Sequence, residues 1–216
     1  AVETEKLSRV DLYGIGTNLT CFSFIQADEE KMEHLAEMRK KVENAAGHTL
    51  EIVSGGNSAA LDLMMRGGIC EGVDNFRLGE SLLFGKERSR YTFLPGTRND
   101  GFILECEVVE AKVKPSLPWG TAGVDSYGRK PVFTNRGEKR KKVICAIGRQ
   151  DFDAETATPV DEGILILGAS SDHLMLDVTD SVKEYKVGDI VELRLGYFSV
   201  LRAFTSPYVE KIFLKK

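Results

Sequence analysis

The chain has few of the features that mark membrane, secreted or nucleic-acid-binding proteins. No apolar run approaches the roughly 20 residues that a helix needs to cross a bilayer, and no secretory signal pattern opens the sequence. The 29 basic residues are outnumbered by 33 acidic ones, which gives a formal net charge of -4, and no basic stripe is interleaved with aromatic residues. We therefore expect neither a membrane nor a nucleic acid as partner.

Cysteine and histidine are scarce and scattered. The four cysteines show neither metal-ligand nor redox spacing: Cys21, Cys70, Cys106 and Cys145. This favours free thiols in a reducing compartment and hence a cytoplasmic location. The three histidines pair with no cysteine or carboxylate at ligand spacing, so we expect no metal site.

The first position has no methionine. The chain begins with Ala1, and its first methionine is Met32. Residues 1–7 look like the tail of a helix rather than a natural beginning. We expect this sequence to be a fragment of a longer protein.

The first 95 residues alternate between apolar runs and helix-like segments. Asp28 is placed to cap a helix whose apolar residues recur at helical spacing until Gly47. A second, short helix is expected over residues 58–66. This alternation predicts parallel strands joined by right-handed crossovers, but three strands are too few to close a barrel. The three apolar runs fall at residues 10–16, 50–53 and 76–78.

From residue 96 onward the pattern is that of a β-domain. Residues 102–114 alternate as a strand, and their phase slips near Val108 and Val109, which predicts a β-bulge. The basic run at residues 136–142 is interpreted as a solvated hairpin tip rather than a clamp for phosphate groups. Further strands are predicted at residues 130–134, 142–147, 164–167, 173–178, 190–195 and 208–214.

A first candidate site follows the second and third strands. Two glycines and then Asn57 and Ser58 open a helix-like segment, which can bring a hydroxyl and backbone N–H groups to a phosphate. Arg77 stands at the next strand end, where a cation needs an anion or another acceptor. Two plain alternatives stay open: Ser58 as a helix N-cap, and Arg77 in a surface salt bridge. Asn18, after the first strand, either points into a pocket or caps its loop.

A second candidate site lies in the β-domain. Arg149 directly follows an apolar strand, and Asp172 and His173 lie in a polar segment after another. Each segment by itself fits a polar turn, and His173 by itself fits a hydrogen-bonded strand residue. Two such turns in one small domain make a polar ligand site more plausible.

Three motifs resemble those of the pyridoxal phosphate (PLP)-dependent alanine racemase family of fold-type III, in particular its alanine/ornithine racemase-like branch. They are Asn-Ser-Ala-Ala at residues 57–60, Arg-Leu-Gly-Glu at residues 77–80 and Gly-Tyr-Phe-Ser-Val at residues 196–200. The resemblance covers essentially the whole chain. It implies the C-terminal part of a TIM-type (β/α)8 barrel over residues 1–95, followed by a mostly antiparallel β-domain over residues 96–216.

The resemblance also implies roles for these motifs. Ser58 contacts the cofactor phosphate, and so does Tyr197. Arg77 faces the pyridine nitrogen and keeps it unprotonated, because adjacent positive charges repel. The backbone N–H groups of Gly79 and Glu80 lie near the phosphate. The expected cofactor-binding residues are thus Asn18, Asn57, Ser58, Arg77, Gly79, Glu80 and Tyr197.

The chain departs from the family at the second site. Arg149 stands where family members have a tyrosine that acts as a base, and arginine is a poor base because it stays protonated. Either Arg149 binds a substrate carboxylate or another residue carries the second proton. Ser171-Asp172 replaces the family's Met-Asp segment, so Asp172 can still touch substrate. These departures favour a substrate other than alanine, and a basic amino acid such as ornithine fits the acidic group. The catalytic candidates are Arg149, Asp172 and His173.

The Schiff-base lysine of the family belongs to a barrel strand that this chain lacks. The resemblance therefore implies an amino-acid racemase that is inactive without its N-terminal barrel half. Its expected partners are a free amino acid, the missing half and a second copy in a homodimer. The alternatives are another fold-type III PLP enzyme (a decarboxylase, aldolase or dehydratase) and a non-catalytic PLP-binding protein.

Overall fold

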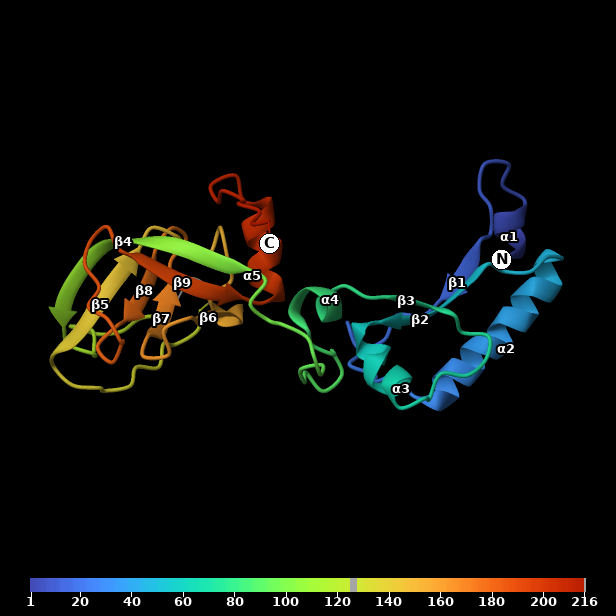
Figure 1. Ribbon diagram of the computed structural model, residues 1–216, viewed down its shortest axis with the longest axis horizontal. Coiled ribbons are helices and arrows are strands. Elements are labelled where there is room, and N and C mark those ends of the chain that lie inside the picture. The colour runs from blue at the N-terminus through green and yellow to red at the C-terminus, as the bar shows by residue number, and fades with distance from the viewer. Residues whose placement is uncertain (125–127, 216) are drawn as a thin grey trace. The chain divides into compact units, whose positions relative to one another are not determined.

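The computed structural model describes residues 1–124 and 128–215 of the chain (Figure 1). It forms two compact units, Ala1–Gly101 and Phe102–Lys216, which we call unit 1 and unit 2 and describe separately. Among the described residues, no helix has the length and apolarity to cross a membrane. No group of His, Cys, Asp and Glu in the same residues is arranged to hold a metal ion.

Unit 1 is built on a small parallel sheet. Its strands are β1 (Gly14–Gly16), β2 (Ile52–Asn57) and β3 (Asn75–Arg77), in the order β1-β2-β3. Both pairings are parallel, which confirms the prediction from strand–helix alternation. β1 is shorter than predicted, because only the last residues of the expected run pair with β2.

The principal helix of unit 1 is α2 (Glu29–Ala46), and it begins and ends as predicted. The Asp28 carboxylate accepts a hydrogen bond from the Lys31 amide at 2.9 Å, and Gly47 ends the helix in the left-handed conformation. The helix lies against the sheet (Figure 1) and buries Met32 and Leu35 with Val53. The other helices of the unit are α1 (Val2–Glu5), η1 (Ser58–Ala60), α3 (Leu61–Met65) and α4 (Glu80–Phe84).

Unit 2 contains a six-stranded sheet in which all described pairings are antiparallel. The mostly antiparallel β-domain is therefore confirmed. The strand order is β6-β9-β4-β5-β8-β7. The bounds are β4 (Ile103–Lys114), β5 (Arg140–Cys145), β6 (Ala157–Pro159), β7 (Leu165–Ala169), β8 (Leu174–Asp177) and β9 (Ile190–Leu195), with η2 (Ala154–Thr156) and α5 (Tyr197–Thr205) beside them.

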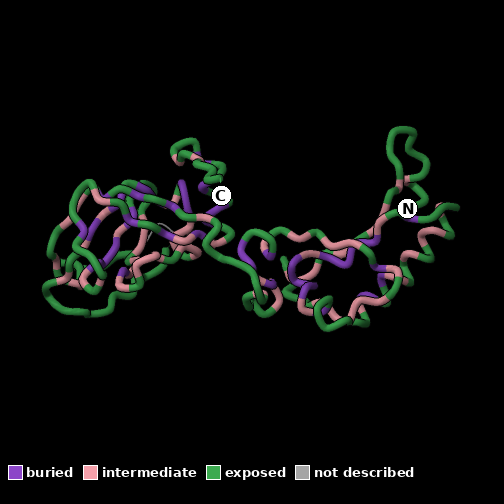
Figure 2. Tube along the Cα trace, viewed as in Figure 1, coloured by how far each residue is buried: buried purple, intermediate pink, exposed green. Residues whose placement is uncertain are grey.

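The long strand β4 carries the core of unit 2. Its first half alternates as predicted, with Leu104, Cys106 and Val108 buried and the glutamates between them exposed (Figure 2). The register against β5 shifts between Val108 and Glu110, so the predicted bulge is confirmed. The bulge lets one strand pair with β9 along its first half and with β5 along its second.

Two predicted strands of the β-domain are wrong, and one helix was missed. Residues 130–134 and 208–214 form no strand. Their apolar side chains stay in solvent, with Val132 93% and Phe213 80% exposed, because alternation alone supplies no neighbouring strand to pair with. The helix α5 was missed, although Val200 and Ala203 mark its buried face.

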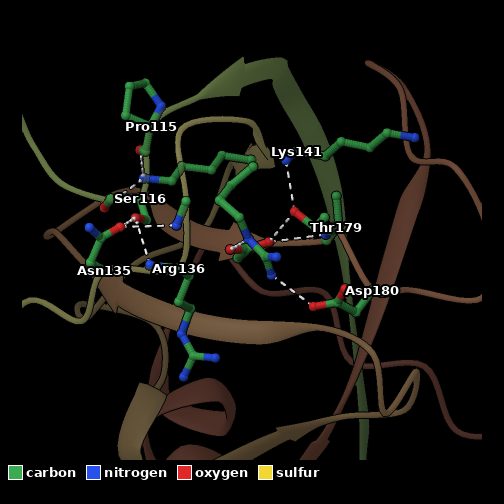
Figure 3. Close-up of polar contacts among 12 residues, drawn as sticks. Pro115, Ser116, Asn135, Arg136, Lys141, Thr179 and Asp180 are labelled. Atoms are coloured by element: carbon green, nitrogen blue, oxygen red, sulfur yellow. Dashed lines mark hydrogen bonds and ion pairs between the residues drawn. The ribbon is translucent and has the colours of Figure 1, made fainter.

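The prediction for the basic run at residues 136–142 holds in part. Residues 136–139 are exposed in the connection between the antiparallel strands β4 and β5, whereas residues 140–142 form the start of β5. The Arg140 guanidinium donates to Asp177 at 2.8 Å and to Asp180 at 2.7 Å. The Lys142 ammonium donates to the Pro115 carbonyl at 2.7 Å. Figure 3 shows these contacts at the base of the loop between β4 and β5. The charges of Arg140 and Lys142 therefore make contacts within the fold, whereas Arg136 and Lys139 are exposed.

Candidate functional site

The C-terminal ends of the three parallel strands bring four of the predicted residues to one edge of the unit 1 sheet. Asn18 follows β1, Asn57 ends β2 and Ser58 comes next, and Arg77 ends β3. In parallel sheets this edge is where ligands bind, because the loops and helix starts that follow the strands face it.

Arg77 is fixed across the three strand ends. Its guanidinium donates one hydrogen bond to the Ser54 hydroxyl at 2.5 Å and another to the Thr17 carbonyl at 2.7 Å. Among the described residues no carboxylate lies within ion-pair distance of it, so the surface salt bridge considered above is not seen there. A guanidinium has five N–H donors, and these two bonds therefore leave it a fixed cation with donors to spare.

Asn57 joins two of the strand ends. Its side-chain oxygen accepts a hydrogen bond from the Ala59 amide at 2.8 Å, which makes Asn57 the N-cap of η1. Its side-chain nitrogen donates to the Asn18 oxygen at 2.8 Å and to the Leu19 carbonyl at 3.2 Å. The cap is thus Asn57, and the alternative that gave this role to Ser58 is wrong.

The Ser58 hydroxyl is buried and meets the start of α4. It accepts a hydrogen bond from the Ser81 amide at 3.2 Å and lies 3.1 Å from the Ser81 hydroxyl. Gly79 is the residue before α4 and Glu80 is its first residue. The Glu80 carboxylate forms an ion pair with Arg88, whose Nε lies 3.2 Å away.

The loop that contains Arg88 is itself held by a buried carboxylate. Glu87 is 3% exposed and accepts hydrogen bonds from the Ser89 amide and hydroxyl and from the Arg90 amide. Burial acts to raise the pKa of Glu87, but these hydrogen bonds, with those from Thr92, outweigh it and hold the pKa below its ordinary value. The Arg88 amide in turn donates to the Ser58 carbonyl at 3.3 Å.

In unit 2 the structure brings the two polar turns together. The Arg149 amide donates to the Ser170 carbonyl at 2.8 Å, and its Nε donates to the Ala169 carbonyl at 2.7 Å. Gly148 makes this approach possible, because a Cβ there would lie 2.2 Å from the Ser171 carbonyl oxygen. The side chain of Arg149 is therefore anchored on the neighbouring turn.

Asp172 and His173 lie in that neighbouring turn, which joins β7 to β8, and both are exposed. The backbone of His173 closes the turn: its carbonyl accepts from the Ser170 amide at 2.8 Å, and its amide donates to the Ser170 hydroxyl at 3.1 Å. Asp172 accepts from the Ser171 hydroxyl at 3.2 Å. The turn thus holds the backbone of these two residues in place and presents their side chains to solvent.

Tyr197 is the first residue of α5 and is 41% exposed. Its ring packs edge-on against Phe198, with ring centres 5.5 Å apart. The helix places this tyrosine in unit 2, the same unit as Arg149.

The residues that hold the candidate side chains were not predicted from the sequence. Ser54 and Thr17 fix Arg77, and Ser81 fixes Ser58. These partners lie 23 to 60 positions away along the chain, and their residue types carry no motif. Strand pairing, which sets Ser54 opposite Gly16, could have indicated Ser54 alone.

No family model matches the chain. It is similar to the curated "Ornithine racemase" of Acetoanaerobium sticklandii, with 44% identity over 209 residues, which covers 97% of this chain and 59% of that protein. It is also similar to the "Lysine racemase" of Thermotoga maritima, with 43% identity over 203 residues, covering 94% and 57%. The predicted resemblance to this racemase family is confirmed.

The fold agrees with this result. A solved alanine racemase from Bartonella henselae with covalently bound pyridoxal phosphate has a TM-score of 0.53 and 19% identity, covering 85% of this chain and 48% of its own. At that identity the likeness shows the fold alone. The chain spans less than three fifths of the length of the curated relatives that it matches.

Proposed function

We propose that the complete protein is a PLP-dependent amino-acid racemase. In this proposal residues 1–95 are the last strands of a TIM-type barrel that holds the cofactor, and residues 96–216 are the β-domain. The supporting observation is the edge of the unit 1 sheet, where three parallel strands end in Asn18, Asn57 with Ser58, and Arg77. This edge combines hydroxyl, amide and guanidinium groups, which can bind a phosphate and place a positive charge beside a ring nitrogen.

The residues of unit 1 fit such a cofactor. The buried Ser58 hydroxyl contacts Ser81 in α4, so this hydroxyl and the amides of Gly79 and Glu80 would hold the phosphate. Tyr197 stays a predicted phosphate contact. Asn57 and Asn18, joined to each other, would line the ring's edge. Arg77 would face the ring nitrogen and keep it unprotonated by charge repulsion.

PLP, when bound, supplies an electron sink that makes the α-proton of an amino acid removable. The residues of this chain then bind the substrate and move protons. A guanidinium is a poor base, so we assign Arg149 the substrate carboxylate. His173 is the candidate proton carrier, because histidine is the most common general acid and base in enzymes. The lysine that would serve the other face lies outside this chain.

The substrate that we propose is a basic amino acid. The two curated relatives are named for ornithine and lysine, and each of these substrates carries a side-chain ammonium group. Asp172 is exposed beside the Arg149 turn and can pair with that ammonium. Assembly with the N-terminal barrel half, a homodimer and a cytoplasmic location remain predictions.

The test uses the complete protein with PLP and L-ornithine, L-lysine or L-alanine in deuterated water. We expect the D-enantiomer of a basic amino acid by chiral chromatography, with deuterium at the α-carbon. Release of carbon dioxide or an aldehyde would instead indicate a decarboxylase or aldolase, and a keto acid a dehydratase. Bound PLP without turnover would indicate a carrier. Arg98→Ala is a suitable control variant, because Arg98 pairs only with nearby Asp100 among the described residues.

A further inference from the structure

We propose that Arg88 is a positioning residue for the cofactor phosphate, because its guanidinium neutralises and holds the Glu80 carboxylate beside the phosphate site. This inference rests on the proposed function, in which the Ser58 hydroxyl and the amides of Gly79 and Glu80 hold the phosphate of PLP. It concerns unit 1 only, where all of these residues lie.

The Glu80 side chain is an unexpected group beside a phosphate. The Glu80 amide is one of the proposed phosphate donors, yet the same residue carries a carboxylate that is only 13% exposed. A phosphate monoester carries about −1.5 to −2 charges at neutral pH. Two negative groups this near to each other repel strongly where water screens them poorly. The site therefore needs a cation for the carboxylate.

Arg88 supplies that cation. Its Nε lies 3.2 Å from a Glu80 carboxylate oxygen, and in the described part of the chain it is the cation within ion-pair distance of Glu80. Tyr91 lies beside the same pair, with its ring centre 5.3 Å from the Arg88 guanidinium. Burial and the Glu80 charge raise the pKa of Tyr91, so this hydroxyl stays protonated and adds no negative charge.

The turn that carries Arg88 is closed without help from its side chain. The Gly85 carbonyl accepts a hydrogen bond from the Leu94 amide at 2.7 Å. Inside the turn, the buried Glu87 carboxylate accepts from the Thr92 amide and hydroxyl, both at 3.2 Å, as well as from residues 89 and 90. Loss of the Arg88 side chain therefore leaves the backbone of the turn in place.

The backbone of Arg88 also contacts the phosphate site. Its amide donates to the Ser58 carbonyl at 3.3 Å, while its side chain reaches Glu80. The Ser58 hydroxyl in turn contacts Ser81, the residue after Glu80. Ser58, Glu80 and Arg88 thus form one contiguous cluster, so a phosphate bound to the first two lies close to both charged side chains.

The plain alternative is an ion pair that only supports the fold. The Arg88 side chain is 41% exposed, and ion pairs near the surface contribute little to stability. The two roles predict different results for a ligand without a phosphate. A role in neutralising Glu80 affects only a charged ligand, whereas a structural role affects every ligand of the site alike.

The experiment measures the binding of PLP and of pyridoxal, which lacks the phosphate, to the complete protein freed of cofactor, by absorbance titration. We expect Arg88→Ala to weaken PLP binding by about tenfold to a hundredfold, because the Glu80 charge then faces the phosphate. Its affinity for pyridoxal should not change, and its melting temperature should fall by less than about 4 °C.

Arg90→Ala is the matched control. It removes an arginine from the same turn, and Arg90 lies 3.3 Å from the Asp62 carboxylate. Asp62 keeps a second ion pair, with Arg66 at 3.1 Å, so no carboxylate is left without a cation. Arg90→Ala should therefore bind PLP as the wild type does.

Glu80→Gln in the Arg88→Ala background decides between neutralisation and direct binding of the phosphate by Arg88. It removes the repelling charge and keeps the amide, so we expect the double variant to recover most of the lost PLP affinity. A double variant no better than Arg88→Ala would overturn the inference.

Three further results would overturn it while the wild type still binds PLP: equal losses for PLP and pyridoxal, a large fall in melting temperature, or an unchanged PLP affinity in Arg88→Ala. A wild type that does not bind PLP would overturn the proposed function, and this inference with it.

Discussion

The two units hold their candidate residues in opposite ways. In unit 1 the candidate side chains are bound to protein: Arg77 to Ser54, Asn57 to Asn18, and Ser58 to Ser81. In unit 2 the Arg149 side chain is anchored on the Ala169 carbonyl, but the Asp172 and His173 turn is closed through the backbone of His173, and both of these side chains are exposed. The first arrangement presents a fixed surface, and the second presents side chains from a fixed backbone.

This difference fits a cofactor that stays and a substrate that leaves. Groups that are already oriented need no reorganisation when charge develops beside them, which is why preorganised donors are effective. Side chains that must take up and release one substrate after another gain from a rigid backbone and free ends. Unit 1 should therefore respond to mutation mainly through cofactor chemistry, and unit 2 through stability, substrate affinity or proton transfer.

The largest effect is expected for Arg77→Ala. Loss of a preorganised charged donor should lower kcat of the complete protein by about a thousandfold, on the order of 4 kcal/mol, because Ser54 and Thr17 hold this guanidinium in one place. Steady-state racemisation and the absorbance spectrum of bound PLP would measure it. Arg77→Lys keeps the charge without the paired hydrogen bonds and should recover part of the rate. A wild-type kcat for Arg77→Ala would show that the Arg77 guanidinium of unit 1 has no role in the reaction.

Asp177 tests the expectation that mutations in unit 2 act through stability. It is 1% exposed and accepts hydrogen bonds from Arg140 at 2.8 Å and from the Thr179 hydroxyl at 2.6 Å. Asp177→Ala leaves Arg140 without its buried partner, so we expect a loss of about 3 kcal/mol in the free energy of unfolding of unit 2. Hydrogen exchange of β5 and β8 would detect it. Asp180→Ala removes the exposed partner of the same arginine and should cost under about 1 kcal/mol. Equal losses would show that burial does not decide the effect.

The same pair predicts how unit 2 responds to acid. Burial acts to raise the pKa of Asp177, but the hydrogen bonds from Arg140 and Thr179 outweigh it and lower the pKa in the folded state. A lowered pKa stabilises the fold above the ordinary carboxyl value of about 4, and this stabilisation is lost as the pH falls through the folded pKa. Below pH 4 the wild type should therefore approach the stability of Asp177→Ala. A gap between them that stays constant on acidification would contradict this assignment.

Several elements were predictable because their signals are local. Asp28 and Gly47 bound α2 as expected, since caps depend on neighbouring residues. The phase slip near Val108 gave the bulge, since it changes which side chains face the core. Local signals also indicated that Asn57, Ser58 and Arg77 end adjacent strands.

The failures concern partners far along the chain. Residues 130–134 and 208–214 have the composition of strands, but pairing depends on an available neighbour that the sequence does not name. The roles of Ser54 and Ser81 depend on parallel register and on the start of α4. The helix α5 was missed because its residues match a tyrosine-containing motif, whereas its helical face is marked only by Val200 and Ala203.

Ser58→Ala should have a smaller effect than Arg77→Ala or Asp177→Ala. We expect it to lower both the free energy of unfolding and the affinity for PLP. The Ser81 amide and hydroxyl lose their buried partner, which costs about 1–2 kcal/mol in unfolding free energy. Affinity for PLP should weaken if this hydroxyl contacts the phosphate. Urea unfolding without PLP and spectroscopic titration with PLP separate the two effects. Ser23→Ala, in an exposed loop, is the matched control. A stability loss without any change in PLP affinity would assign Ser58 a structural role only.

The smallest effect is expected for substitution of Asp28, which caps helix α2 of unit 1. Asp28→Ala removes the N-cap of α2 and should cost about 1 kcal/mol, seen as faster hydrogen exchange in the first turn of that helix. Asp28→Asn keeps a side-chain oxygen that can accept from the Lys31 amide, so it should retain most of the stability. Neither substitution should change kcat, because Asp28 shares no hydrogen bond with Arg77, Asn57 or Ser58 among the described contacts. A fall in kcat for Asp28→Ala would show that the fixed surface of unit 1 depends on the whole unit rather than on its three strand ends.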